Sequence, residues 1–130
     1  MQFNKFILAP SALFLKEPAS LEEWGELSTF LCNIQRSVPW WIGDMVERGE
    51  QAHGDLIYQA FDETMSVNMV QRYSKVCREF PPLARNATLS HSHHAKLVGL
   101  PKEVQAALLA RAELEGWDNE RMGRELRCIK

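Results

Sequence analysis

The chain has 130 residues, of which 45% are hydrophobic and 25% charged, and its net charge is −2. These values are typical of one folded globular domain and exclude a disordered or fibrous protein. No apolar run approaches the roughly 20 residues that span a bilayer, and Pro10, Lys16 and Glu17 interrupt the apolar start of the chain. We therefore expect a cytoplasmic protein without a membrane segment. Three scattered cysteines without CxxC spacing fit a reducing compartment: Cys32, Cys77 and Cys128.

Charge is distributed unevenly along the chain. Residues 17–63 carry ten acids against two bases, whereas residues 64–130 carry eleven bases against seven acids. A positive surface attracts phosphate groups, so the second half of the chain is the expected place for nucleic acid. The acidic half is expected to face elsewhere or to contact a protein partner.

Residues 1–19 are predicted to form an extended or β arm. Two short apolar runs, Phe3–Leu8 and Ala12–Lys16, flank Ala9-Pro10-Ser11. They are either strands of a small hairpin or one extended arm that lies along another molecule. A lone two-stranded hairpin is marginal in water. The arm must therefore pack on its own helices or on a second subunit, and a homodimer is the simplest arrangement of the second kind.

Residues 20–52 are predicted to form two supporting helices. Ser20-Leu21-Glu22-Glu23 is a capping box, which predicts a helix from about Leu21 to Ser37. Pro39 ends this helix, because proline disfavours helical conformation in the preceding residue, and opens the next one. Trp40 and Trp41 are interpreted as core anchors in preference to base-stacking residues. The stripe expected to be buried in the first helix is Leu21, Trp24, Leu27, Leu31 and Ile34.

Residues 55–80 have the spacing of a helix-turn-helix. Ala60 is the small residue expected where two helices cross, Thr64-Met65 the turn, and Ser66 the N-cap of the second helix. The candidate recognition helix is Val67–Lys75. Its buried stripe is predicted to be Met69, Val70, Tyr73, Cys77 and Phe80. The turn lacks its usual glycine, so an αα-hairpin that contacts no DNA stays open as the alternative.

The recognition helix carries the residue types that read DNA. Asn and Gln pair with adenine and Arg with guanine in the major groove, which assigns base contacts to Asn68, Gln71 and Arg72. Phosphate contacts are assigned to polar and basic side chains in and after the helix: Ser66, Lys75, Arg78 and Arg85, with Ser90 and His91 as further candidates.

Residues 88–130 are predicted to form the C-terminal helices. Pro81-Pro82 stops the recognition helix, and Ser90 caps a short helix that reaches Leu100. Pro101 starts a helix through Leu114, which Gly116 closes. Asp118 caps a last helix, Asn119–Arg127. Its arginines are expected on a solvated face, with phosphate contact as the alternative: Arg121, Arg124 and Arg127.

The histidines at His91, His93 and His94 do not amount to a metal site. Zinc sites need further ligands at set spacings, and on a helix only His91 and His94 share a face. A packed histidine pair or a helix start that touches phosphate is the favoured interpretation. The sequence also has no glycine-rich phosphate loop, paired-carboxylate constellation or nucleophile motif. We expect no metal, no cofactor and no catalytic residue.

Two stretches together are similar to a known family. Trp40-Trp41-Ile42-Gly43-Asp44, followed by the glycines and the helix after Ser66, precede Phe80-Pro81-Pro82 and Leu89-Ser90-His91-Ser92-His93-His94. This order resembles the LmbU-type family of bacterial DNA-binding transcriptional regulators, whose relatives also occur in phages and other mobile elements. The tail from Leu89 to Arg127 also resembles a module of ParB-type partition proteins and YhcG-type nucleases. The resemblance implies sequence-specific DNA binding without catalysis.

The sequence thus predicts a mainly α, multi-helix helix-turn-helix domain with a short N-terminal β-strand or hairpin arm. The leading hypothesis is a homodimeric transcriptional regulator of double-stranded DNA. The alternative is a protein-interaction or adaptor module of a partition, nuclease or phage complex, recruited through the acidic N-terminal half.

Overall fold

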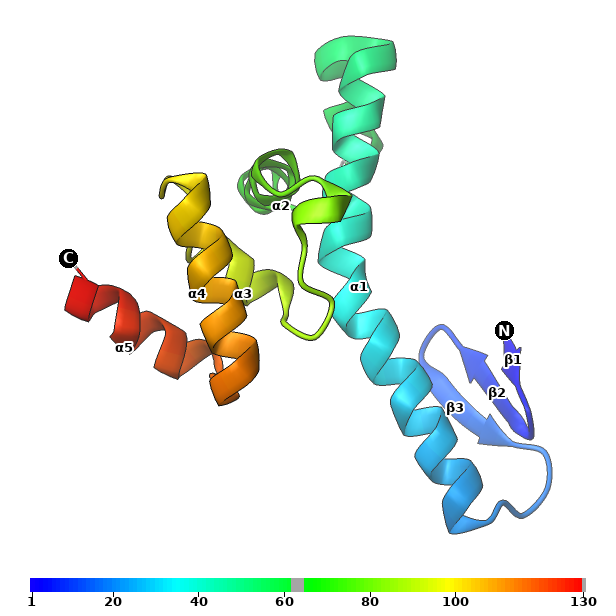
Figure 1. Cartoon of the computed structure of the whole chain (residues 1–130). Coiled ribbons are helices and arrows are strands. Elements are labelled where there is room, and N and C mark those ends of the chain that lie inside the picture. The colour runs from blue at the N-terminus through cyan, green and yellow to red at the C-terminus, as the bar shows by residue number, and fades with distance from the viewer. Residues whose placement is uncertain (62–64, 130) are drawn as a thin grey trace. The chain divides into compact units, whose positions relative to one another are not determined.

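The computed structural model describes residues 1–61 and 65–129. In these residues the chain is mainly α, with five α-helices, two short 3-10 helices and one small sheet (Figure 1). The predicted mainly α fold with an N-terminal β arm is confirmed. The chain divides into two compact units, Met1–Gln35 and Arg36–Lys130. No helix of the described residues is long and apolar enough to cross a lipid bilayer.

The N-terminal unit contains a three-stranded antiparallel sheet in the order β1-β2-β3. The predicted hairpin is present, but the run Phe3–Leu8 is divided into two strands. Asn4 turns the chain there with a φ of 52°, a conformation that asparagine tolerates better than most residues. Phe6 packs edge-on against Trp24, and Phe3 stacks on Phe30 with ring centroids 4.4 Å apart. The strands are β1 Gln2–Phe3, β2 Phe6–Ala9 and β3 Ala12–Leu15.

Helix α1 spans Leu21–His53, so the prediction of two helices separated at Pro39 is wrong. The capping box at its start is confirmed, with hydrogen bonds of 3.2 and 3.0 Å between Ser20 and Glu23. A proline inside a helix costs about 3 kcal/mol. Here Trp40, directly after it, packs against the hydrophobic core of the C-terminal unit, and its carbonyl accepts a hydrogen bond from Cys77. These contacts of Trp40 act against the cost of Pro39.

The buried stripe predicted for the first part of α1 is mostly exposed. Leu27 is buried, but Leu21 is 88% exposed, and Trp24 and Leu31 are each 40% exposed. The small sheet of this unit covers too little of the helix to bury the whole stripe.

The segment before the candidate recognition helix is a 3-10 helix, η1 Gly54–Phe61, where an α-helix was predicted. It packs tightly on the end of α1, because the Ile57 side chain occupies the space that a Cβ on Gly49 would fill. The Tyr58 hydroxyl also donates a 2.6 Å hydrogen bond to Glu50. Ala60, predicted at a helix crossing, is exposed. The predicted turn residue Thr64 lies outside the described residues.

Helix α2, Val67–Glu79, begins after Ser66 as predicted, and the Ser66 hydroxyl accepts the Met69 N–H. Its buried side chains differ in part from the predicted stripe. Met69 is 41% exposed and Tyr73 is half-buried, whereas Ser74 and Val76 are buried. The difference arises because α2 is covered on more than one side, as described below.

Helices α1 and α2 approach each other closely at Gly43. A Cβ on Gly43 would lie 2.6 Å from the Tyr73 carbonyl oxygen and would also meet Cys77. Glycine therefore lets the two helix backbones pack directly on each other. The crossing predicted at Ala60 was that of the two helices of the helix-turn-helix, so the contact between α1 and α2 at Gly43 is a separate one.

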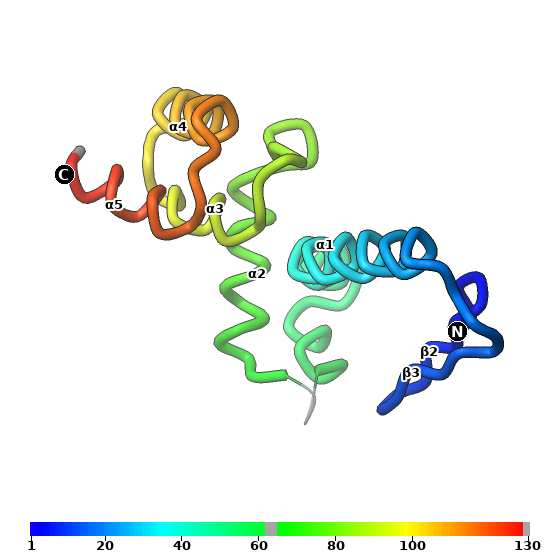
Figure 2. The backbone as a smooth tube through the Cα atoms, turned by 90° about the horizontal axis from the view of Figure 1, so that it is seen from below, coloured from blue at the N-terminus to red at the C-terminus, as the bar shows by residue number. Residues whose placement is uncertain are grey.

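The C-terminal helices follow a short 3-10 turn, η2 Pro82–Ala84. The predicted starts at Ser90, Pro101 and Asp118 are confirmed. The first of these helices ends at Ala95 and does not reach Leu100, because i to i+3 turns follow and Gly99 has a φ of 93°. Figure 2 shows these helices at the C-terminal end of α2. They are α3 His91–Ala95, α4 Lys102–Glu115 and α5 Asn119–Ile129.

Gly43 offers a direct test of the crossing. Gly43→Ala should destabilise the protein by about 1–3 kcal/mol, because the added Cβ overpacks a backbone contact. The matched control is Gly25→Ala in the same helix, where a Cβ meets no atom within 4 Å. Removing the excess freedom of that glycine should stabilise by about 0.4–1 kcal/mol. Urea unfolding of the two variants gives both values, and equal midpoints would contradict the packing described here.

Candidate nucleic-acid interface

One face of α2 carries the three residues predicted to read DNA bases together with Lys75, which is predicted to contact phosphate. Asn68, Gln71, Arg72 and Lys75 follow the i, i+3, i+4, i+7 spacing that places side chains on one side of a helix, and all four are exposed. Three of the four buried residues of α2 lie on the opposite side, Val70, Ser74 and Cys77, and the fourth, Val76, lies between the two faces. Among the described residues, no acidic side chain forms an ion pair with Arg72 or Lys75.

Two hydrophobic clusters hold α2 in place. Val70, near its start, packs with Val46 of α1 and Phe61 of η1. Near its end, Val76 and the following Phe80 belong to the larger core formed with the C-terminal helices. Because the helix is fixed at both ends, its exposed side chains project from a rigid support. Side chains on such a support are positioned more accurately than side chains on a loop.

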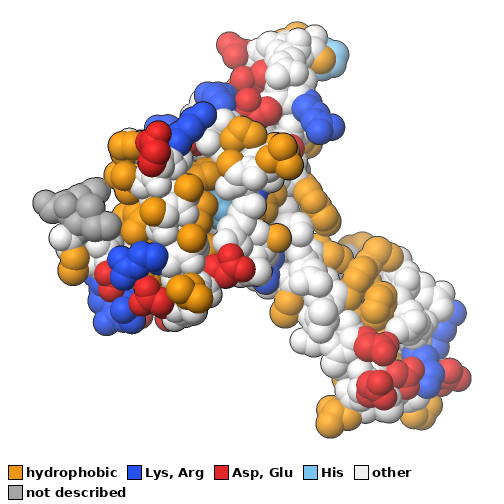
Figure 3. All heavy atoms as spheres, in the orientation of Figure 1, with side chains coloured by type: hydrophobic (Ala, Val, Ile, Leu, Met, Phe, Trp, Pro, Cys, Tyr) orange, Lys and Arg blue, Asp and Glu red, His pale blue; other side chains and the backbone are white. Residues whose placement is uncertain are grey.

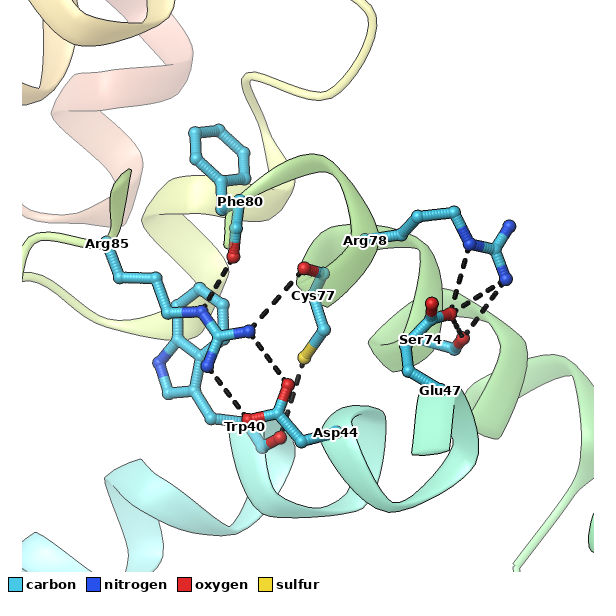
Figure 4. Close-up of polar contacts among 8 residues, drawn as sticks. All are labelled: Trp40, Asp44, Glu47, Ser74, Cys77, Arg78, Phe80 and Arg85. Atoms are coloured by element: carbon cyan, nitrogen blue, oxygen red, sulfur yellow. Dashed lines mark hydrogen bonds and ion pairs between the residues drawn. The ribbon is translucent and has the colours of Figure 1, made fainter. Parts of the chain in front are cut away.

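Arg85 is part of the internal structure. Its guanidinium forms two hydrogen bonds to the Asp44 carboxylate, at 2.9 and 2.8 Å, and one of 2.7 Å to the Phe80 carbonyl (Figure 4). It also lies 4.4 Å from the centre of the Trp40 ring. Only 15% of the Arg85 side chain is exposed. Hydrogen bonding to Arg85 holds the pKa of the Asp44 carboxyl below its usual value. The phosphate contact predicted for Arg85 gains no support from this arrangement.

Arg78 is paired but still accessible. Its guanidinium lies 2.8 Å from the Glu47 carboxylate and 3.7 Å from that of Glu50, and 59% of the side chain is exposed (Figure 4). The Ser74 hydroxyl donates a further 2.7 Å hydrogen bond to Glu47. Burial acts to raise the pKa of the Glu47 carboxyl, but the hydrogen bonds from Arg78 and Ser74 outweigh it and the pKa is lowered. A phosphate would have to compete with Glu47 for Arg78.

The two serines assigned to phosphate serve as helix caps. Ser66 is exposed at the start of α2, whereas the Ser90 hydroxyl accepts the His93 N–H within a capping box. His91 is buried among aromatic rings, with centroids 4.6 Å from Trp40 and 5.2 Å from Tyr73. Of the two serines, only Ser66 is exposed on the same helix as the base-reading candidates.

The histidine cluster is packed and hydrogen-bonded. The Nε2 atom of His94 accepts the Asn86 N–H at 3.0 Å, so its Nδ1–H donates to the Ser90 carbonyl at 2.7 Å. The Nδ1 atom of His93 accepts the Ser90 N–H, and its Nε2–H donates to the Trp117 carbonyl at 2.8 Å. In both rings, both nitrogens are thereby engaged in hydrogen bonds. Within the part of the chain that the structure describes, no three His, Cys, Asp or Glu residues are grouped to hold a metal ion.

Many of the basic residues in the second half of the chain are paired with acids. Besides Arg78 and Arg85, Arg111 pairs with Glu115 at 3.1 Å and Arg121 with Glu125 at 2.9 Å. The positive excess of this half therefore resides in cations without a described ion pair: Arg72, Lys75, Lys96, Lys102, Arg124 and Arg127. Two of these are on the exposed face of α2.

Three residues of α1 that position α2 were not among the candidates predicted from the sequence: Gly43, Asp44 and Glu47. Gly43 and Asp44 lie in the stretch that carries the family resemblance, but their partners are about 30 to 40 residues further along the chain. The only local signal was a glycine inside a helical pattern, which often marks close packing.

Comparison with curated proteins finds similarity to the transcriptional regulator NovE of Streptomyces niveus, with 29% identity over 110 residues. The match covers 84% of this chain and 51% of NovE, so the chain spans about half the length of that relative. No protein-family model matches the chain, and no solved structure matches it. The similarity supports a role in transcriptional regulation. The resemblance of the tail to ParB-type and YhcG-type modules stays a prediction.

The buried histidines predict a decline of stability in mild acid. Burial lowers the pKa of His91 to about 4, against an ordinary value of 6.5, and burial also lowers that of His94. Below pH 6.5 the unfolded chain binds protons that the folded chain cannot, so the free energy of unfolding should fall as the pH decreases toward 4. The measurement is the urea midpoint at a series of pH values.

His91→Phe keeps an aromatic ring in place and should reduce this decline. The matched control is His53→Phe, which replaces an exposed histidine and should leave the decline unchanged. The same pH dependence in His91→Phe as in the unaltered protein would contradict the burial of a neutral His91.

Proposed function

We propose that this protein is a sequence-specific, double-stranded DNA-binding transcriptional regulator without catalytic activity, and that it acts as a homodimer. The observation that carries the proposal is the exposed face of α2, which presents two amides and two cations free of described ion pairs. The similarity to a transcriptional regulator supports the same role.

Helix α2 has the dimensions and chemistry for the major groove. At 1.5 Å per residue, its 13 residues extend for about 20 Å, and the groove is roughly 12 Å wide, which admits a helix. Asn68 and Gln71 are proposed to contact adenine and Arg72 guanine. Lys75 and Ser66 are proposed to contact phosphate, with Arg78 beside them once it is released from Glu47. In this arrangement α2 is the second helix of a helix-turn-helix whose first element is η1.

A protein-interaction role is the second candidate, and specific features of α1 favour it. Trp41 is 59% exposed and Met45 lies one turn further along the same helix, also exposed. Large apolar side chains at the surface often mark protein contacts. An adaptor of this kind would bind DNA weakly by itself and would bury Trp41 against its partner.

Selection from a random double-stranded DNA pool at about 0.15 M salt tests the proposal, because this salt concentration screens simple phosphate attraction. We expect an enriched inverted repeat, with half-sites roughly 34–36 Å apart or a multiple of that distance. No enrichment would contradict sequence-specific binding and favour the adaptor role.

Arg72→Ala tests the assignment of α2 within the selected site. It should weaken binding by about 1–3 kcal/mol and relax the preference at one base pair of each half-site. The matched control is Arg124→Ala on α5, which removes the same charge from another exposed arginine. That change should leave the base preferences intact. Binding assays with every single-base variant of the site distinguish the two outcomes, and unchanged specificity in Arg72→Ala would show that α2 is not the reading helix.

A further inference from the structure

The unit Met1–Gln35 buries little of its apolar surface. Its buried hydrophobic residues are Phe6 and Leu27, and Figure 3 shows hydrophobic side chains at the surface of this unit. A unit of fewer than about 40 residues rarely folds stably without disulfides, metals or oligomerisation. The described cysteines are free thiols. The large apolar side chains exposed here are Met1, Leu13, Phe14, Leu15, Leu21, Trp24 and Leu31.

Strand β3 is an unprotected sheet edge. It pairs with β2 on one side, with Phe14 opposite Ile7 and Leu13 opposite Leu8, and it is the last strand of the sheet. The Lys16 N–H donates to the Lys5 carbonyl at 2.8 Å, which places the even-numbered residues of β3 in the hydrogen-bonded pairs with β2. The backbone N–H and C=O groups of Leu13 and Leu15 therefore point away from β2, toward the free edge.

All four side chains of β3 are apolar and exposed. Proteins commonly protect a sheet edge with charged residues, proline or a bulge placed within the strand. Strand β3 has none of these between Ala12 and Leu15. An exposed, uncharged edge of this kind is suited to pairing with another strand.

We propose that β3 pairs antiparallel with β3 of a second copy of the chain, about a two-fold axis that passes beside Phe14. In this register Leu13 of one copy is opposite Leu15 of the other, so the outward N–H and C=O groups of both residues are satisfied. Phe14 is then opposite Phe14 of the second copy in a non-hydrogen-bonded pair, where side chains are closest. The inference rests on the homodimer of the proposed function. It assigns the dimer interface to β3 and defines the register in which the two β3 strands pair.

Charge and symmetry select a second copy in the antiparallel orientation. Lys16 and Glu17 follow β3 directly. A parallel pair would bring each of these charges beside its own copy, whereas the antiparallel pair places Lys16 opposite Ala12 and separates the two lysines along the sheet. A two-fold interface uses the same surface patch on both subunits, so the patch must be self-complementary. An apolar strand with two outward N–H and two outward C=O groups meets this requirement.

The test is disulfide cross-linking at the proposed two-fold axis. Phe14→Cys is made in the full chain with Cys32→Ser and Cys128→Ser, and is oxidised with copper phenanthroline in the absence of DNA. Burial raises the pKa of the remaining Cys77 thiol to about 12, which keeps it unreactive. We expect a covalent dimer within the first minutes. The matched control is Glu22→Cys in the same background, an exposed helix position outside the strand. Cross-linking of Phe14→Cys no faster than this control would overturn the register.

Edge charges give an independent measurement. Leu13→Lys with Leu15→Lys should raise the dimer dissociation constant at least tenfold in sedimentation equilibrium. Leu114→Lys removes an exposed leucine from α4, outside the strand, and should leave the dissociation constant unchanged. A monomeric unaltered protein, or no shift in the double variant, would overturn the proposal. Binding of a single half-site by the double variant separates this outcome from a failure of DNA recognition, because α2 is unaltered.

Discussion

The direct packing of α1 on α2 at Gly43 is the contact on which the C-terminal unit depends. Because no side chain separates the two backbones there, Asp44 reaches Arg85 and Glu47 reaches Arg78 and Ser74 on the same side of α1. These polar contacts tie α2 and the chain that follows it to one helix. Their effect is to fix the direction in which the opposite face of α2 points.

Basic residues in this unit serve two different purposes. The hydrogen bonds of Arg85 are made inside the protein, and its guanidinium lies over Trp40. Removing Arg85 would leave Asp44 without its partner. Arg72 and Lys75 have no described ion pair and remain exposed to solvent. Net charge alone does not separate these groups, since each residue counts as one positive charge. The proposed DNA contacts rest on the second group, for which no internal partner has to be displaced.

The N-terminal unit presents a different problem, because it has a sheet and a helix but almost no core. The exposed apolar edge of β3 and the exposed leucines of α1 are features that a monomer would normally avoid. Pairing between two copies would turn the three-stranded sheet into one of six strands. It would also supply the two-fold symmetry that an inverted-repeat DNA site requires. The N-terminal unit would then hold the dimer together, and the C-terminal unit would contact the DNA.

Local signals in the sequence determined where most helices begin. Ser20, Ser66, Ser90 and Asp118 cap helices as predicted, because a cap depends on groups within three or four residues of each other. The sequence also placed Asn68, Gln71, Arg72 and Lys75 of α2 correctly outside its buried stripe. Only the tertiary structure decided that α1 continues through Pro39, that residues 54–61 form a 3-10 helix, and that Arg85 is internal while Arg72 is exposed. Each of these features depends on contacts with residues distant in the sequence or on packing against a neighbouring helix. A local sequence pattern does not contain the energies of those contacts.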